Sequence, residues 1–287
     1  MNSHQKIYSL IYYGDDFTGS TDALEFISMH GLKTVLFMDV PDESMLSRFP
    51  GLDAFGVAGM TRSLRNDEMR STLENDFNQL SSFHAKHIHY KVCSTFDSSA
   101  SIGSIGLAID IGSRIFASSL VPVLGGMPLI GRYCTFSNLF VRMGIGSNGK
   151  IYRLDMHPSM SKHPVTPAGE SDLRIHLGRQ TSKNISSIDL DCMKQPIPNW
   201  NDMLTDSDVV VVVDAMEEND LSKFGNWLDT EIQGESIFSV GSSGVEAGLG
   251  MYWNSIGRFT QKTDWKKPGH SGPMLLSLIH ISEPTRH

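Results

Sequence analysis

The sequence predicts an α/β protein built on an open, mostly parallel sheet flanked by helices. Two observations predict this class. Short apolar segments of strand length alternate along the 287 residues with segments of helical periodicity. The second observation is the run of five valines from Val209 to Val213. It has no polar alternation, which is typical of a strand covered on both faces. The predicted strands are residues 6–13, 33–38, 53–59, 86–92, 208–214 and 236–240.

The segments between these strands have the periodicity of amphipathic helices, as in Rossmann-like folds. Asn66 is placed to cap one helix, with Asp67 and Glu68 in its first turn near the positive end of the helix dipole. Another helix is expected to begin near Ile105. Two apolar stripes at spacings of one, three and four are Met69, Leu73, Phe77, Leu80 and Phe83, and Leu221, Phe224, Trp227 and Leu228. Ligands of such sheets bind beyond the carboxyl ends of the strands.

Composition narrows the function classes. A formal net charge of -8 argues against non-specific nucleic-acid binding, which needs clustered Lys and Arg. Cys93, Cys134 and Cys192 are far apart with no CxxC, so neither a disulfide framework nor a zinc site is expected. The N-terminus lacks the pattern of a signal peptide, and no segment reaches the roughly 18 apolar residues of a membrane span. We expect a cytoplasmic protein that binds neither nucleic acid nor membrane.

Residues 125–185 are rich in Gly, His and Pro and predict a β-rich or loop-rich insertion that carries ligand contacts. Within it, "GIGSNG" (144–149) matches GxGxxG, but a strand pattern follows instead of a helix, so a hairpin turn is predicted. Elsewhere, His84, His87 and His89 are expected to be packed or surface histidines on a strand.

The first candidate site is "YYGDDFTGSTD" (12–22), at the end of the first strand. The adjacent carboxylates of Asp15 and Asp16 could accept hydrogen bonds from sugar hydroxyls, bind Mg²⁺ or act as a general base. The alternative is helix capping by Thr18, Ser20 or Thr21. The residues alone leave both interpretations open.

The second candidate, residues 90–106, also joins a strand to a helix. Lys91 could neutralise a carboxylate, and the polyol partners that this loop offers are Ser94, Thr95, Asp97 and Ser98. A Ser-rich capping loop is the alternative. A third strand–loop–helix turn, Gly241, Ser242, Ser243 and Gly244, could bind an anion on helix amides, although a tight turn explains it almost as well.

The last candidate lies in the insertion, at 153–181. His157 and His163 each precede proline, and a helix is expected to carry Glu170 and Arg174, which could pair at i, i+4. The histidine spacing does not match a helical zinc motif, so hydrogen bonding to a hydroxy acid is the better interpretation, and no metal site is predicted.

Three stretches in this order, "GDDFTGSTD", "KVCSTFDSS..GSIG" and "HP....HPVTP..ESDLR.HL..QT", resemble the N-terminal domain of the four-carbon acid sugar kinases. That family includes 3-oxo-tetronate, D-threonate and D-erythronate kinases, and the resemblance runs from about residue 6 to about 275. It implies an ATP-dependent kinase acting on the terminal hydroxyl of a sugar acid, with a C-terminal domain supplying most of the site for ATP and Mg²⁺. The matching positions imply a substrate pocket of Asp15, Asp16, Arg62, Lys91, Ser94, Asp97, His163 and Glu170.

From these arguments we predict Asp15 and Asp16 as catalytic residues and Gly241, Ser242, Ser243 and Gly244 as cofactor-binding residues. The predicted substrate-binding residues are Thr18, Arg62, Lys91, Ser94, Thr95, Asp97, Ser98, His157, His163 and Glu170. Lys91 and Arg62 are expected to counter the substrate carboxylate, and a homodimer is expected.

Three regions are expected along the chain. Residues 1–268 form the sugar-acid domain, 269–276 begin a truncated nucleotide-binding domain, and 277–287 ("SLIHISEPTRH" at the end) resemble translated sequencing-adapter read-through. The fragment is therefore expected to be inactive alone. The rival hypothesis is a non-catalytic α/β module that binds a sugar acid or a nucleotide. A dehydrogenase is disfavoured, because no GxGxxG is followed by a helix.

Overall fold

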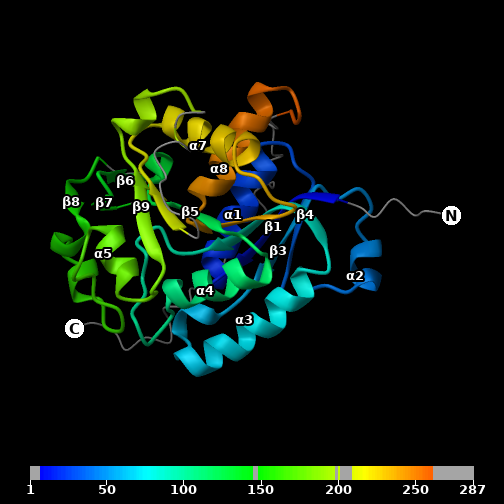
Figure 1. Cartoon of the computed structure of the whole chain (residues 1–287), viewed down its shortest axis with the longest axis horizontal. Coiled ribbons are helices and arrows are strands. Elements are labelled where there is room, and N and C mark those ends of the chain that lie inside the picture. Colours follow the sequence, from blue (N-terminus) through cyan, green and yellow to red (C-terminus); the bar gives the residue numbers. More distant parts are fainter. Residues whose placement is uncertain (1–6, 145–147, 198–199, 201–208, 261–287) are drawn as a thin grey trace, which may run out of the picture.

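The computed structural model describes residues 7–144, 148–197, 200 and 209–260. Its centre is an eight-stranded sheet in which every strand pair is parallel, which confirms the predicted fold class (Figure 1). The strand order is β2-β3-β1-β4-β11-β5-β10-β9. The strands are β1 (Ile7–Gly14), β2 (Thr34–Phe37), β3 (Ala54–Ala58), β4 (His84–Lys91), β5 (Leu120–Leu124), β9 (Asn184–Ile188), β10 (Val209–Val213) and β11 (Ile237–Gly241).

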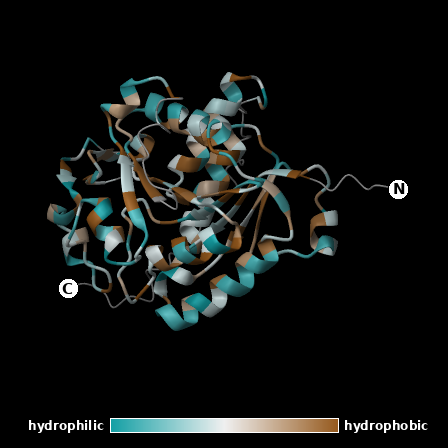
Figure 2. Ribbon diagram, viewed as in Figure 1, coloured by the Kyte–Doolittle hydropathy of each residue, from teal (hydrophilic) through white to brown (hydrophobic). Residues whose placement is uncertain are grey.

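Helices cover both faces of this sheet and enclose two apolar cores. One face carries α3 (Asn66–Leu80) and α4 (Ile105–Ile115), and the other carries α1 (Phe17–Met29), α7 (Glu218–Thr230) and α8 (Gly244–Ser255). Figure 2 shows hydrophobic residues along the central strands and a largely hydrophilic α3. Because both faces are covered, the central strands are mostly buried, and Val210 to Val213 are fully buried.

The predicted helix faces are largely confirmed. Met69, Leu73, Phe77 and Leu80 are buried, as are the four residues of the second stripe, whereas Phe83 lies beyond the end of α3 and is half-buried. The predicted capping role of Asn66 is wrong. Arg65 occupies the N-cap, and the Asn66 amide instead donates to the carbonyl of Ala100 (2.8 Å), which ties α3 to the loop after β4.

The insertion forms a small antiparallel sheet of β6 (Arg132–Thr135), β7 (Asn138–Arg142) and β8 (Ile151–Arg153), as its composition predicted. β7 and β8 pair antiparallel on either side of "GIGSNG", as a hairpin requires, although residues 145–147 lie outside the described ones. Cys134 and Ala215 exchange two backbone hydrogen bonds (2.9 and 3.1 Å), which join the small sheet to the segment after β10.

The described residues also form two short α-helices, α2 (Glu43–Ser47) and α5 (Leu173–Gly178). The remaining described helices are of the 3-10 type, namely η1 (Thr61–Ser63), η2 (Pro128–Ile130), η3 (Leu154–Met156), η4 (Met160–Lys162) and η5 (Cys192–Lys194). Of the helices that the structure describes, none is long and apolar enough to cross a bilayer. The expectations for residues 269–287 concern a part of the chain outside the described residues.

Candidate functional site

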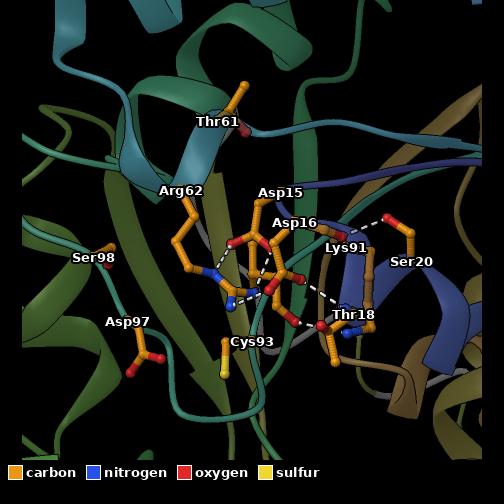
Figure 3. A network of polar contacts seen from close by, with 12 residues as sticks. Asp15, Asp16, Thr18, Ser20, Thr61, Arg62, Lys91, Cys93, Asp97 and Ser98 are labelled. Carbon is orange, nitrogen blue, oxygen red and sulfur yellow. Dashed lines mark hydrogen bonds and ion pairs between the residues drawn. The ribbon is translucent and has the colours of Figure 1, made fainter. Parts of the chain in front are cut away.

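A compact cluster of ion pairs lies at the carboxyl end of β1 (Figure 3). The guanidinium of Arg62 donates to both oxygens of Asp15, from Nε at 3.0 Å and Nη2 at 2.6 Å, and its Nη1 donates to Asp16 Oδ2 at 2.6 Å. One arginine thus binds both adjacent carboxylates. Such charge-assisted bidentate pairs are among the strongest side-chain hydrogen bonds.

The parallel sheet brings these residues together. The Asp15 amide donates to the carbonyl of Lys91 (2.8 Å), and the Arg62 amide donates to the carbonyl of Asp15 (3.0 Å). The ends of β1 and β4 and the turn after β3 are therefore held side by side. Gly14 is needed here, because a Cβ at that position would lie 1.9 Å from the Ser20 hydroxyl oxygen.

A helix cap does form at the Asp-Asp pair, but not through the residues predicted for it, and the role of the pair in a ligand site stays a prediction. Asp16 is itself the N-cap of α1, since its Oδ1 accepts from the Gly19 amide at 2.7 Å while Oδ2 binds Arg62. Thr18, Ser20 and Thr21 lie inside the helix and do not cap it. Asp15 is buried at 3% exposure, so of the two carboxylates only Asp16 faces open space.

Lys91 adds a second cation beside this cluster. Its side chain is 2% exposed, and Nζ donates to the carbonyl of Val92 at 3.0 Å and lies 3.6 Å from Asp22 Oδ2. Deeper in the same region, the carboxylate of Glu246 is fully buried, 3.6 Å from His89 Nε2. Neither oxygen of Glu246 has a hydrogen-bond partner among the described residues.

Burial shifts the pKa values of this region. It raises the pKa of Asp15, a rise that the Arg62 guanidinium opposes. Burial opposes the charge of Arg62, but the carboxylates of Asp15 and Asp16 outweigh it and raise the pKa of the guanidinium. Burial also raises the pKa of Glu246 to about 8 and that of the Cys93 thiol to about 11. Arg62 therefore keeps its charge, and Cys93 presents a neutral thiol at neutral pH.

A cavity of about 430 Å³ opens beside the cluster. It brings together five of the residues predicted from sequence, namely Asp16, Thr18, Arg62, Lys91 and Ser94. Sequence reasoning missed its other walls, Gly19, Asp22, Glu25, Phe26, Cys93 and Ile130. A signal for some of them existed, since Thr18, Asp22, Glu25 and Phe26 follow helical spacing and share one face of α1.

The other predicted residues of the loop after β4 lie next to this cavity but not in its wall. Thr95 donates to Asp97 Oδ1 at 2.9 Å. The Ser98 hydroxyl contacts His176 Nε2 at 2.8 Å and accepts from the Gln180 amide at 3.0 Å, which ties the loop to α5. Figure 3 shows Asp97 and Ser98 on this loop, on the Arg62 side of the cluster. Their substrate role stays a prediction.

The three predicted residues of the insertion also lie outside the cavity wall. His157 Nδ1 accepts from the amides of Ser159 and Met160, both at 3.3 Å, and His163 Nδ1 accepts from the Thr166 amide at 3.0 Å. Both histidines therefore order their own loops. Whether they contact a substrate stays a prediction.

One local prediction in the insertion is wrong. Glu170 is not on a helix, because α5 begins only at Leu173. It lies 3.4 Å from Arg179, whereas Arg174 pairs with Asp172 at 2.7 Å, so the expected pair of Glu170 with Arg174 does not form.

The turn Gly241, Ser242, Ser243 and Gly244 is fully buried. A Cβ on Gly244 would lie 2.6 Å from the carbonyl oxygen of Gly126, so the backbone at Gly126 covers the start of α8. This geometry is that of a tight strand-to-helix turn. The predicted cofactor contact of these four residues stays a prediction.

The carboxylates at the end of β1 leave no oxygen without a donor that could be a ligand of the implied magnesium ion. Asp15 and Asp16 give three of their four oxygens to Arg62 and the fourth to the Gly19 amide. In the part of the chain that the structure describes, no group of three or more His, Cys, Asp or Glu could hold a metal ion. The described residues therefore do not fit a magnesium site.

Residues 10–249 match the family of sugar-binding N-terminal domains. The chain belongs to this family, in agreement with its resemblance to the N-terminal domain of four-carbon acid sugar kinases. It is 43% identical over 251 residues to a 3-oxo-isoapionate kinase of Paraburkholderia graminis. The aligned region covers 86% of this chain and 52% of that protein. It is 29% identical over 252 residues to a 3-oxo-tetronate kinase of Methylobacterium radiotolerans, with 86% and 55% covered. The chain thus spans about half the length of these curated relatives.

Solved structures share the fold. One from Salmonella typhimurium LT2 superposes with a TM-score of 0.76 at 25% identity and covers 88% of this chain and 57% of that one. Another, from Bordetella bronchiseptica, has a TM-score of 0.65 at 20% identity and covers 85% and 56%. That protein is a domain-swapped dimer with bound citrate.

Proposed function

We propose that this chain is the sugar-acid-binding part of an ATP-dependent kinase that phosphorylates a four-carbon acid sugar, a tetronate or 3-oxo-tetronate, on its terminal hydroxyl. The observation that carries the proposal is the cluster of Asp15, Asp16 and Arg62 at the wall of a 430 Å³ cavity, with Lys91 beside it. Carboxylates, cations and hydroxyls gathered at one end of a sheet suit a small polyhydroxylated ligand. Relatives named as kinases of 3-oxo acids support the substrate class.

We propose different roles for the two aspartates. Asp16 lines the cavity, and its side chain is 29% exposed, so it accepts a hydrogen bond from a substrate hydroxyl and orients that group. Asp15 is buried and fixes the guanidinium of Arg62 through two hydrogen bonds. Phosphoryl transfer depends chiefly on positioning and charge neutralisation, which a rigid cluster of this kind provides to the acceptor hydroxyl.

ATP with Mg²⁺ would supply the phosphoryl group and neutralise its charge. The proposal places that site in the part of such kinases that this chain does not span, since the chain covers about half of its kinase relatives. Binding of the acid sugar is then the step that this chain performs by itself.

Two measurements test the proposal. Calorimetry with D-erythronate and D-threonate should show binding to this chain. A chimera in which residues 10–249 replace the matching part of the Paraburkholderia kinase should then consume ATP in the presence of the acid. Binding without turnover in the chimera would favour the rival, a non-catalytic binding module, and no binding of any tetronate would contradict the proposal.

In that chimera Asp16→Asn should lower turnover by at least about tenfold, because the amide keeps the shape but loses the charge that receives the hydroxyl and binds Arg62. Asp67→Asn, in the first turn of α3 and away from the cavity, is the matched control. Unchanged turnover of the Asp16 variant on every tetronate tried would remove its assigned role.

A further inference from the structure

The cavity beside Asp16 is poorly suited to the carboxylate of an acid sugar. Its wall carries three acids, Asp16, Asp22 and Glu25, and two cations, Arg62 and Lys91. Both cations are already engaged, Arg62 by two carboxylates and Lys91 by a contact with Asp22. An incoming carboxylate would meet net negative charge here, whereas hydroxyl groups would find acceptors. The ligand's carboxylate therefore needs another cation.

Arg132, at the start of β6, is a buried cation. It is 8% exposed and forms no ion pair within the described residues. Its Nη1 donates to the carbonyls of Ile130 (3.2 Å), Gly131 (3.4 Å) and Arg142 (3.2 Å), while its Nε has no acceptor among the described residues. Buried arginine is rarely left without a carboxylate, because an unpaired buried charge is costly.

The position of Arg132 links the insertion to the cavity. Ile130, two residues earlier, lines the cavity, and the Asp97 carboxylate, on the loop after β4, opposes the lowering of the pKa of Arg132 by burial. Across the small sheet, Arg132 pairs with Val141 and Val141 with Tyr152. The Tyr152 ring centroid lies 5.7 Å from that of His157, whose pKa is lowered by burial and by the charge of Arg132. The charge of Arg132 is thus felt both on the loop after β4 and on the loop after β8.

His157 also offers a hydrogen-bond donor. Two backbone amides donate to its Nδ1, so the neutral ring carries its proton on Nε2. Arg132 and His157 therefore both offer N–H groups, and an anion is the partner that matches two donors. A planar guanidinium anchored through one nitrogen retains donors for the bidentate grip that carboxylates prefer.

We propose that Arg132, together with the Nε2–H of His157, binds the carboxylate of the acid sugar, while the wall of Asp16, Arg62 and Lys91 receives its hydroxyls. This inference rests on the proposed function and replaces the expectation that Arg62 and Lys91 counter the carboxylate. It fixes the direction of the ligand, with the acid end at the small antiparallel sheet and the hydroxyl end at β1.

Calorimetry on this chain with D-erythronate and with erythritol, its neutral counterpart, tests the assignment. Arg132→Gln should weaken binding of the acid about 10- to 100-fold, the range for a charged hydrogen-bonded contact, and leave erythritol within about twofold. Arg132→Lys keeps the charge without the planar fork, so its affinity for D-erythronate should lie between those of the unsubstituted chain and of Arg132→Gln. Arg153→Gln removes an exposed arginine of the same small sheet and should change neither ligand.

The outcomes separate the two proposals. If the unsubstituted chain binds no sugar acid, the proposed function fails and this assignment with it. If the unsubstituted chain binds the acid and Arg132→Gln binds it equally well, only the present inference fails. Should the glutamine variant not fold, a structure of the unsubstituted chain with D-erythronate decides. A carboxylate within about 3 Å of Arg132 supports the assignment, and one bound at Arg62 or Lys91 overturns it.

Discussion

Single side chains in this protein serve structure and site at once. Asp16 caps α1 with one oxygen and binds Arg62 with the other, so its position is fixed by the helix before any ligand arrives. The sequence shows such a residue plainly, because two acids between glycines follow a strand. Arg132 and Glu246 give no comparable signal. Both side chains are buried, and Arg132 Nε and the two carboxyl oxygens of Glu246 have no hydrogen-bond partner among the described residues. This combination can be recognised only from the structure.

Glu246 makes the pH dependence of stability predictable at the residue scale. Its neighbours are His89, Lys91, Asp22 and Tyr12, and burial raises its pKa to about 8 from an ordinary 4.5. Between these values the folded state retains a proton that the unfolded state has lost, so raising the pH favours unfolding. Burial lowers the pKa of His89 to about 3, so its effect on stability is confined to pH values below its ordinary 6.5.

Glu246→Gln should therefore remove a loss of stability between pH 6.5 and pH 8. Relative to the unsubstituted chain, the free energy of unfolding of the variant should rise by on the order of 1–2 kcal/mol over this interval. Urea unfolding at several pH values measures it. The exposed Glu235→Gln should run parallel to the unsubstituted chain. Parallel curves for the Glu246 variant as well would show that this carboxyl group is not protonated in the folded state.

At the scale of elements, helices α7 and α8 pack so closely that their backbones are in contact. A Cβ on Gly225 would lie 2.1 Å from the carbonyl oxygen of Gly248, and one on Gly248 would lie 2.5 Å from that of Leu221. Two glycines thus allow the helices to meet without side chains between them. This close contact fixes α8, and with it Glu246, against the sheet.

Gly225→Ala should destabilise the protein by about 1–3 kcal/mol, because the overpacking cost exceeds the gain of up to about 1 kcal/mol in helix propensity. Gly178→Ala is the matched control in α5, where the added carbon would meet only Ile185 at 3.8 Å. The control should be neutral or slightly stabilising in chemical denaturation. A Gly225 variant as stable as the control would mean that the two helices separate at little cost.

Elements with uniform apolar character could be predicted from sequence, and those with mixed character could not. Six strands of the large sheet lie within a residue or two of the prediction. The other two were not predicted, because a proline interrupts β5 (Leu120–Leu124) and polar residues dominate β9 (Asn184–Ile188). The start of α5 was predicted too early, since Glu170 accepts from the amides of Ser171 and Asp172 in a turn of its own. The cap of α3 failed for a similar reason, as Asn66 found a partner in another loop.

At the scale of the whole molecule, the candidate site lies at the carboxyl end of the large sheet, and its cavity wall includes Ile130, next to the small sheet, so ligand binding should stabilise both sheets together. A sugar acid at a hundredfold excess over its Kd adds about 2.7 kcal/mol to the free energy of unfolding, which for a chain of this size raises Tm by roughly 5–10 °C. Differential scanning fluorimetry measures the shift. ATP alone should leave Tm unchanged, and a shift with ATP but not with the acid would contradict the site assignment. The expected homodimer stays a prediction that sedimentation tests.

The order of strands also has a bearing on how the protein is made. Among the described residues, β11 is the last strand of the large sheet along the chain, yet it lies inside the sheet, between β4 and β5. Until residues 237–241 have left the ribosome, the earlier strands form two separate groups, each with an unpaired inner edge. Pairing across so long a separation is slow, and uncovered edges favour aggregation. A nascent chain that stalls before Ile237 therefore exposes the unpaired edges of β4 and β5 and should bind chaperones. The sheet becomes continuous only when β11 pairs with both strands.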